Sequence, residues 1–438
     1  MTPQEYLPIL LAALGERLPE IKLSRRYVNG DAPLPEMGAN LRDSWMAFQR
    51  KSRTNLGGRT CESLAGRIIP LGVRVGDNAG AAAEIARRHY RDNRLGMVFQ
   101  DAAWNALTTG FGYLLTQDVD GRPVTTSERP EQMITIPDPL QPWRAVAGVK
   151  AWRDKIKGVD HATVWVPGVE QHFTRDAKSE LGSYRRLSND GWQPGEPIEY
   201  DGRVPIHVLE NPHGQGEVTA HRDVIDRINL GKLQRLVTVA MQAYKQRVVE
   251  GLGEPDEEDP VDYGKVFDPA PGAIWDLPDG AKLTELSDGA AGIQAMLQGE
   301  VADIREYCGV TGTPMSNFLS DAQNQSAEGA MNAKEAEISK AEKRIELYRP
   351  SFEGAILDGL RVYGVDAGET VEVEFAPTAF VSFGERAQAA NLAKTAGMPT
   401  RWIARNIWGQ SADQIREIET DVAFEQLTLF GANSGDAA

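Results

Sequence analysis

The chain has 438 residues, of which 41% are hydrophobic and 25% charged, a composition typical of folded globular proteins rather than of disordered or collagen-like ones. Its 47 basic and 63 acidic residues give a net charge of −16, which argues against ordinary tight binding to DNA or RNA through a basic surface. No apolar run approaches the ~20 residues that span a bilayer, and the length favours roughly two to four domains.

The acidic charge has two interpretations. It can simply keep the protein soluble, or it can belong to a protein that handles a polyanion without holding it. The two cysteines, Cys61 and Cys308, are too few for a disulfide framework or a four-thiolate zinc site, and they fit a reducing compartment. The N-terminus is acidic and precedes no apolar core, so we expect no cleaved secretion leader.

Catalytic motifs are not found. The six histidines form neither a His-Glu-x-x-His nor a His-x-Glu pattern, and neither a nucleophile elbow nor a phosphate-binding P-loop occurs. The pair Gly214 and Gly216 lacks the third glycine of a dinucleotide-binding loop. We therefore predict no catalytic residue, no metal site and no cofactor.

The first half of the chain changes character near residue 111. Residues 1–115 have helical periodicity, with helices predicted over 81–94 and 95–109. Short alternating runs between 111 and 205, separated by Asp-Gly and proline turns, predict antiparallel strands. The fold class is therefore α+β.

Two long helices with a small insert follow. Apolar residues at helical spacing predict a helix over 218–249, about 45 Å long, and a second one over 289–308. Between them, residues 254–260 are acidic and bounded by proline, so they must be exposed, and residues 261–286 have short strand-like runs. This pattern predicts a helical hairpin with a small β-containing tip.

A polar segment over 309–324 leads into a third long helix, 326–363. Its apolar stripe is narrow and rich in alanine, and Pro350 should kink it. A helix with so little apolar surface needs neighbours, which suggests oligomeric packing. A strand over 370–375 and helices over 382–396, 401–408 and 411–430 complete the chain. The Ala-Gly-Met-Pro-Thr turn at 396–400 could mimic a helix-turn-helix reader of DNA, but the helix after it offers few groups for base edges and its surroundings are acidic, so this interpretation is disfavoured.

Four stretches of sequence, in this order, carry a resemblance to a known family: residues 202–212 (GRVPIHVLENP), residues 271–280 (PGAIWDLPDG), residues 309–314 with 324–330 (GVTGTP and NQSAEGA), and residues 390–409 around Ala-Gly-Met-Pro. Taken together over nearly the whole chain, they resemble a portal protein of tailed double-stranded-DNA bacteriophages, the head-to-tail connector.

The resemblance implies a domain organisation. It divides the chain into a mixed α/β wing with N-terminal helices (1–217), stem helix one (218–249), a small β-containing clip (250–286), stem helix two (287–309), a tunnel loop (310–325), a long kinked helix (326–363), and a helical C-terminus that completes the wing and forms a short crown (364–438). It also implies a structural protein rather than an enzyme, located in the virion at the capsid portal vertex and in the host cytoplasm during assembly.

The candidate site residues fall into four groups. Polar tunnel-loop residues should line the DNA channel: Thr313, Asn317, Ser320, Asn324 and Gln325. Five lysines could contact phosphates, although helix-face salt bridges are the alternative: Lys232, Lys245, Lys334, Lys340 and Lys343. Clip residues should dock partners: Glu254, Asp256, Glu257, Glu258, Asp259 and Trp275. Residues of the long helix should pack between copies: Ala327, Met331, Ile338, Ala341 and Ile345.

The resemblance implies several partners. The chain should form a homo-oligomeric ring, of about twelve copies in this family, and contact double-stranded DNA without sequence specificity. The large terminase, the major capsid protein with its scaffold, and a head–tail adaptor should dock on it, and no membrane is involved. Two alternatives remain: another phage connector or baseplate component, and an unrecognised enzyme. The 310–325 segment also keeps the alternative of a plain surface linker.

Overall fold

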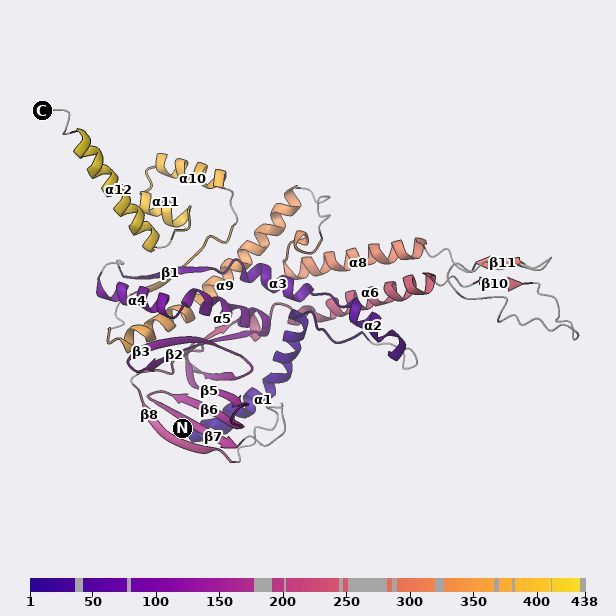
Figure 1. The fold of residues 1–438 in the computed structure, drawn as a ribbon, viewed down its shortest axis with the longest axis horizontal. Coiled ribbons are helices and arrows are strands. Elements are labelled where there is room, and N and C mark those ends of the chain that lie inside the picture. Colours follow the sequence, from indigo (N-terminus) through magenta and orange to yellow (C-terminus); the bar gives the residue numbers. More distant parts are fainter. Residues whose placement is uncertain are drawn as a thin grey trace, which may run out of the picture. The chain divides into compact units, whose positions relative to one another are not determined.

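The computed structural model describes residues 1–35, 42–76, 80–176, 191–200, 202–243, 247–250, 282–285, 290–319, 327–365, 370–379, 383–410 and 412–433. The chain divides into two compact units. Unit 1 comprises Met1–Asp31, Asn55–Ala220 and Thr311–Ala438, and unit 2 comprises Ala32–Thr54 and His221–Val310. Helices and antiparallel sheets occur together, which confirms the predicted α+β class (Figure 1).

A five-stranded antiparallel sheet in unit 1 is covered by the N-terminal helix α1 (Pro3–Val28). The helix begins with a capping box, in which Thr2 and Glu5 satisfy each other's backbone N–H groups. Its leucines, among them Leu10 and Leu14, pack on Val149 and Val164 of the sheet. The strand order is β4 (Met133–Pro137), β5 (Ala145–Asp154), β6 (Val159–Val166), β7 (Val169–Asp176) and β8 (Gln193–Glu199).

A second sheet of unit 1 has the order β3 (Arg122–Glu128), β2 (Phe111–Val119) and β9 (Ile206–Glu210). Helix α5 (Leu95–Thr109) ends at Gly110, whose left-handed backbone turns the chain directly into β2. A Cβ atom at Gly112 would lie 2.1 Å from the carbonyl oxygen of Ala102, so only glycine allows this close approach of strand and helix.

The third sheet of unit 1 pairs strands that are far apart in the sequence. Strand β1 (Pro70–Val75) is antiparallel to β12 (Val371–Phe375). Helices α3 (Leu56–Ala65) and α4 (Ala81–Asp92) flank β1 in the chain. Together with α5 these elements enclose a hydrophobic core, in which the rings of Phe99 and Phe352 stack at 4.5 Å between centroids.

Helix α9 (Ala327–Val362) runs through that core and continues past Pro350 as one helix. Its apolar residues Tyr348, Phe352, Ile356 and Leu360 are all buried. We predicted Ala341 and Ile345 to pack between copies of the chain, whereas the structure buries both in the core of their own chain. Residues distant in the sequence, which periodicity does not reveal, cover these two side chains.

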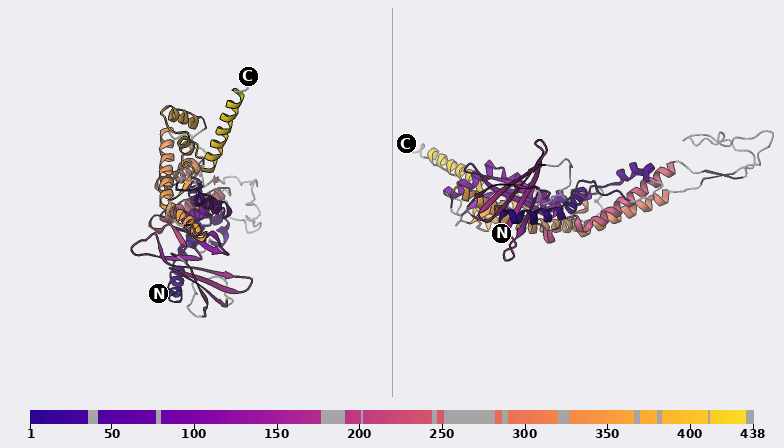
Figure 2. Two further views of the ribbon diagram at one scale, coloured as in Figure 1. Left: turned by 90° about the vertical axis from the view of Figure 1, so that its left-hand side faces the viewer. Right: turned by 90° about the horizontal axis from the view of Figure 1, so that it is seen from below.

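Unit 2 contains helices α2 (Arg42–Ser52), α6 (Arg222–Ala243) and α8 (Ala290–Thr311) and the two-stranded ribbon of β10 (Arg247–Glu250) and β11 (Lys282–Glu285). Helices α6 and α8 lie side by side and antiparallel (Figures 1 and 2). The helix predicted over 218–249 is shorter at both ends in the structure, because α6 covers only Arg222–Ala243. Residues 247–250 form a strand because they pair with residues 282–285.

The C-terminal helices of unit 1 are α10 (Phe383–Thr395), α11 (Thr400–Asn406) and α12 (Ala412–Asn433), close to their predicted bounds. Short 3-10 turns occur at Pro212–Gly214, Thr219–His221 and Met315–Asn317. Within the described part of the chain, no helix is both long enough and apolar enough to cross a membrane.

Candidate channel and assembly residues

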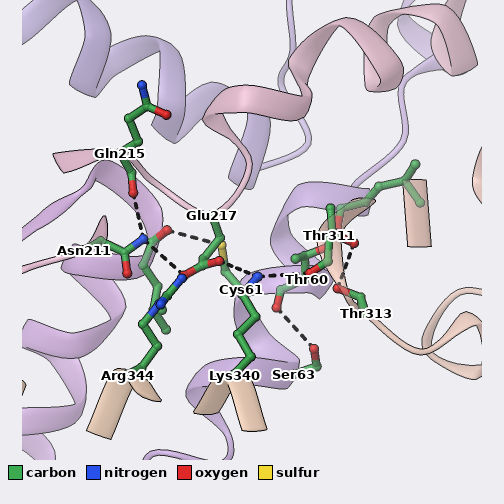
Figure 3. Close-up of polar contacts among 12 residues, drawn as sticks. Thr60, Cys61, Ser63, Asn211, Gln215, Glu217, Thr311, Thr313, Lys340 and Arg344 are labelled. Atoms are coloured by element: carbon green, nitrogen blue, oxygen red, sulfur yellow. Dashed lines mark hydrogen bonds and ion pairs between the residues drawn. The ribbon is translucent and has the colours of Figure 1, made fainter. Parts of the chain in front are cut away.

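A buried carboxylate, Glu217, is the centre of a polar cluster in unit 1 (Figure 3). Its side chain is 3% exposed and receives Lys340 Nζ at 2.6 Å and Arg344 Nε at 2.8 Å, both from α9. Asn211 Nδ2 donates to the same carboxylate at 3.1 Å. The two cations compensate the buried negative charge, and the charged hydrogen bonds satisfy the oxygen atoms.

The segment that carries Glu217 packs closely against the C-terminal end of α5. The backbone N–H of Glu217 donates to the carbonyl of Leu107, and that of Asn211 donates to the carbonyl of Gly110. A Cβ atom at Gly216 would lie 2.3 Å from the carbonyl oxygen of Thr108. The Gly-x-Gly pattern at 214–216, which looks like a weak phosphate loop in the sequence, thus serves close packing of backbone on backbone.

The electrostatics of this cluster favour fixed ionisation states. Burial raises the pKa of Glu217, but Lys340 and Arg344 outweigh burial and leave that pKa below its ordinary value. Burial, reinforced by the charge of Glu217, raises the pKa of the Cys61 thiol. Burial likewise raises the pKa of Tyr348, whose hydroxyl donates to Asn211 Oδ1 at 2.8 Å. The thiol therefore stays protonated and is a poor nucleophile.

Lys340 also reaches the start of the predicted tunnel loop. Its Nζ donates to the carbonyl oxygen of Thr311, the last residue of α8, at 3.0 Å. Thr311 Oγ1 in turn donates to Thr313 Oγ1 at 3.0 Å, and both threonines are buried. A cation at the carbonyl end of a helix is favourable, because the last carbonyl groups have no partner within the helix.

A second buried carboxylate of α9, Glu337, binds the next part of that loop. Arg67 contacts Glu337 Oε2 through Nε at 2.9 Å and Nη2 at 2.6 Å, and Asn317 Nδ2 donates to Glu337 Oε1 at 3.4 Å. Arg59 Nε donates to the carbonyl of Asn317 at 3.4 Å. The described part of the loop, residues 311–319, therefore lies against α9 and α3 at several points.

The candidate lysines divide by environment. Lys232 pairs with Glu300 at 3.1 Å, within the α6–α8 hairpin of unit 2, and Lys340 pairs with Glu217. For these two the structure favours the salt-bridge alternative. Lys334 and Lys343 are exposed on α9, and Lys245 lies outside the described residues.

The predicted loop and clip residues are placed only in part. Thr313, expected to line a channel, has a buried side chain in the structure, and Asn317 is partly covered and bonded to Glu337. The other loop candidates, Ser320, Asn324 and Gln325, lie outside the described residues, as do all the clip candidates: Glu254, Asp256, Glu257, Glu258, Asp259 and Trp275.

Of the predicted inter-subunit residues, Ile338 is half-buried, and the side chains of Ala327 and Met331 lie outside the described part. Sequence patterns did not single out the charged group formed by Glu217, Arg67, Glu337 and Arg344. One signal was present, because positions 337, 340 and 344 share a helix face with the buried positions 341, 345 and 348. Charges on the buried face of a helix must be paired.

Among the described residues, no three His, Cys, Asp or Glu side chains converge so as to hold a metal ion.

Comparison with solved structures finds "Virion of native gene transfer agent (GTA) particle" and "Neck of native GTA particle computed with C12 symmetry". Each has 14% identity, a TM-score of 0.45, and coverage of 89% of this chain and 99% of that one. A third, "Neck of empty GTA particle computed with C6 symmetry", has 16% identity, the same TM-score, and coverage of 86% and 95%.

No curated protein sequence matches the chain. The family model described as "Phage portal protein, SPP1 Gp6-like" matches residues 9–423, which is nearly the whole length. The elements within that span include the α1-covered sheet, the α6–α8 hairpin and the long helix α9. The chain therefore belongs to the phage portal protein family of the SPP1 Gp6-like type.

Proposed function

We propose that this protein forms a ring of about twelve copies at one capsid vertex and provides the channel through which double-stranded DNA is packaged and ejected. The observation that carries the proposal is the family match over residues 9–423. The protein would be a structural component of the virion, assembled in the host cytoplasm, and not an enzyme.

The segments would divide this work along the chain. Residues 1–217 and 364–438 would form the wing with a short crown, residues 218–249 and 287–309 the stem, residues 250–286 the clip, and residues 310–325 the tunnel loop held by the helix over 326–363. The clip, with its acidic residues 254–259, would dock the large terminase and later the head–tail adaptor. The wing would contact the capsid protein and scaffold.

Weak contact with DNA suits the charges of the chain. A DNA channel must let successive phosphates pass without holding the duplex at any fixed position. It therefore needs a hydrated wall with few unpaired cations, because each free Lys or Arg would strengthen binding to the phosphates. The net charge of −16 and the pairing of Lys232 and Lys340 with carboxylates support such a wall. Lys334 and Lys343 are the exposed candidates for shallow phosphate contacts.

The direct test is the state of the purified full-length protein. We expect sedimentation at roughly twelve times the 48.0 kDa of one chain, and rings with a central hole in electron micrographs. Particles assembled with this protein should retain DNase-resistant DNA. A stable single copy that never forms rings, even with its capsid protein and scaffold, would refute the proposal.

Docking by the clip can be tested separately. Replacement of residues 254–259 by glycine and serine should leave rings intact but weaken terminase and adaptor binding, because the acidic side chains are exposed docking groups in this proposal. Pull-down of each partner by preassembled rings measures the effect, and a glycine and serine replacement of the exposed residues 155–157 is the control. Unchanged binding of both partners would remove the clip assignment.

A further inference from the structure

The chain leaves unit 1 after Ala220 and returns to it at Thr311. Glu217 lies just before the chain leaves unit 1, and Thr311 is where the chain returns. Lys340 therefore contacts two residues that are 94 positions apart in the sequence. The ammonium group of Lys340 thus links the segment before residues 221–310 to the segment after them. It lies 2.6 Å from the Glu217 carboxylate and 3.0 Å from the Thr311 carbonyl oxygen.

The contact with Thr311 defines how the following segment begins. Helix α8 ends at Thr311, and Gly312 has the left-handed backbone (φ +65°) that commonly follows a helix end. Lys340 donates to a carbonyl oxygen at the C-terminal end of the helix, where a cation is favourable. Because Lys340 extends from α9, which packs in a core of unit 1, the start of residues 312–319 is tied to that core.

A second contact holds the segment further along. Asn317 donates to Glu337, which lies one helical turn before Lys340 and is itself fixed by Arg67. Arg344 contacts Glu217, whereas Lys340 contacts both Glu217 and the Thr311 carbonyl. Lys340 and Arg344 therefore share one carboxylate and differ in their relation to the segment, which allows their roles to be separated by mutation.

We propose that Lys340 is a positioning residue for the channel segment, and that its bridge from Glu217 to the Thr311 carbonyl sets where residues 311–319 stand relative to α9. This inference rests on the proposed function, since it takes residues 310–325 to line the DNA channel. Glu217 orients the ammonium group, and Asn317 with Glu337 completes the attachment.

The test compares four variants of the full-length, assembled protein by hydrogen–deuterium exchange. In K340M, Glu217 keeps Arg344 and Asn211, so the fold should persist while exchange over residues 311–319 rises about tenfold. K340R, which retains a cation of similar reach, should restore most of the protection. K22M removes an exposed lysine of α1 that has no part in the proposed channel, and it should leave exchange unchanged.

R344M provides the matched structural control. It removes the other cation of Glu217, so it should lower the unfolding temperature without raising exchange selectively over 311–319. A second readout is the DNase-resistant DNA retained in particles assembled with each variant. K340M should reduce retention and K340R should restore it, whereas K22M should match the wild type.

Two results would overturn the inference. One is an exchange pattern in K340M that equals that of the wild type or rises uniformly over the chain. The other is increased exchange over 311–319 with unchanged DNA retention. Failure of the proposed function is distinct from both, because it would appear in the wild-type protein itself as an absence of rings or of retained DNA.

Discussion

At the scale of single residues, His89 shows how burial sets a charge state. Its side chain is fully buried, with Nδ1 3.0 Å from Asn93 Nδ2 and Nε2 3.2 Å from Thr125 Oγ1. Burial lowers the pKa of His89 to about 4, from 6.5. The imidazole is therefore neutral in the folded protein at every pH above that value, while the unfolded chain takes up a proton below 6.5.

This difference predicts a loss of stability on mild acidification. Between pH 6.5 and about 4 the unfolded state binds a proton that the folded state does not, so the free energy of unfolding falls as the pH falls. From pH 7 to pH 5 the loss should be on the order of 2 kcal/mol. Urea titrations of the wild type and H89Q measure it, and H89Q should show the shallower pH dependence. Parallel pH profiles of the two proteins would contradict this assignment.

Gly359 of α9 packs directly against the imidazole of His89. A Cβ atom at this position would lie 2.4 Å from His89 Nε2, and the imidazole is held by hydrogen bonds on both sides. We expect G359A to destabilise the protein by about 1–3 kcal/mol through overpacking, although alanine normally favours a helix. Thermal unfolding measures the change. G299A in α8 is the control and should be neutral or stabilising, because an added Cβ atom there would meet no described atom within 4 Å outside its chain neighbours and its own helix backbone.

At the scale of elements, helix α9 combines two functions on one face. The buried Glu337 and the partly buried Lys340 and Arg344 alternate with buried residues at 341, 345 and 348. The charged side chains contact the segments that precede α6 and follow α8, and the apolar side chains pack in the core. In unit 2, by contrast, α6 and α8 contact each other through ion pairs on partly exposed surfaces, such as Arg235 with Glu300.

Ala341 distinguishes packing within the chain from packing between chains. Because Ala341 is fully buried in the core of its own chain, A341E would place an unpaired carboxylate there. We expect the variant to lose several kcal/mol of stability and to fail to fold as a monomer, not merely to fail to form rings. Circular dichroism and size-exclusion chromatography measure this, with K343E as the surface control. A folded, ring-deficient A341E monomer would instead support the inter-subunit assignment.

At the scale of the whole molecule, the net charge of −16 opposes the proposed assembly. Twelve like-charged copies repel one another in a ring, and salt screens this repulsion. The screening length is about 30 Å at 0.01 M salt and about 8 Å at 0.15 M. Apolar contacts between copies are much less affected by salt over this range.

Salt should therefore favour ring formation. We expect the fraction of protein in rings to rise as the ionic strength increases from 0.01 M to 0.15 M, because the repulsion between copies falls. Sedimentation velocity at several protein concentrations measures that fraction. The uncharged osmolyte sucrose, matched for density, controls for effects other than screening. Dissociation of rings on addition of salt would show that ion pairs dominate the interface.

The sequence by itself determined the helices, many of the strands and the family. Apolar periodicity and turn residues are local signals, so the bounds of α5, α8 and α9 lie close to their predicted bounds. Only the tertiary structure decided which charges pair and where the first long helix ends. Arg67 and Glu337 are 270 positions apart, and Glu217 and Arg344 are 127 apart. A local pattern cannot choose such partners, because their contact depends on how α9 packs in the core, just as residues 247–250 become a strand only through pairing with residues 282–285.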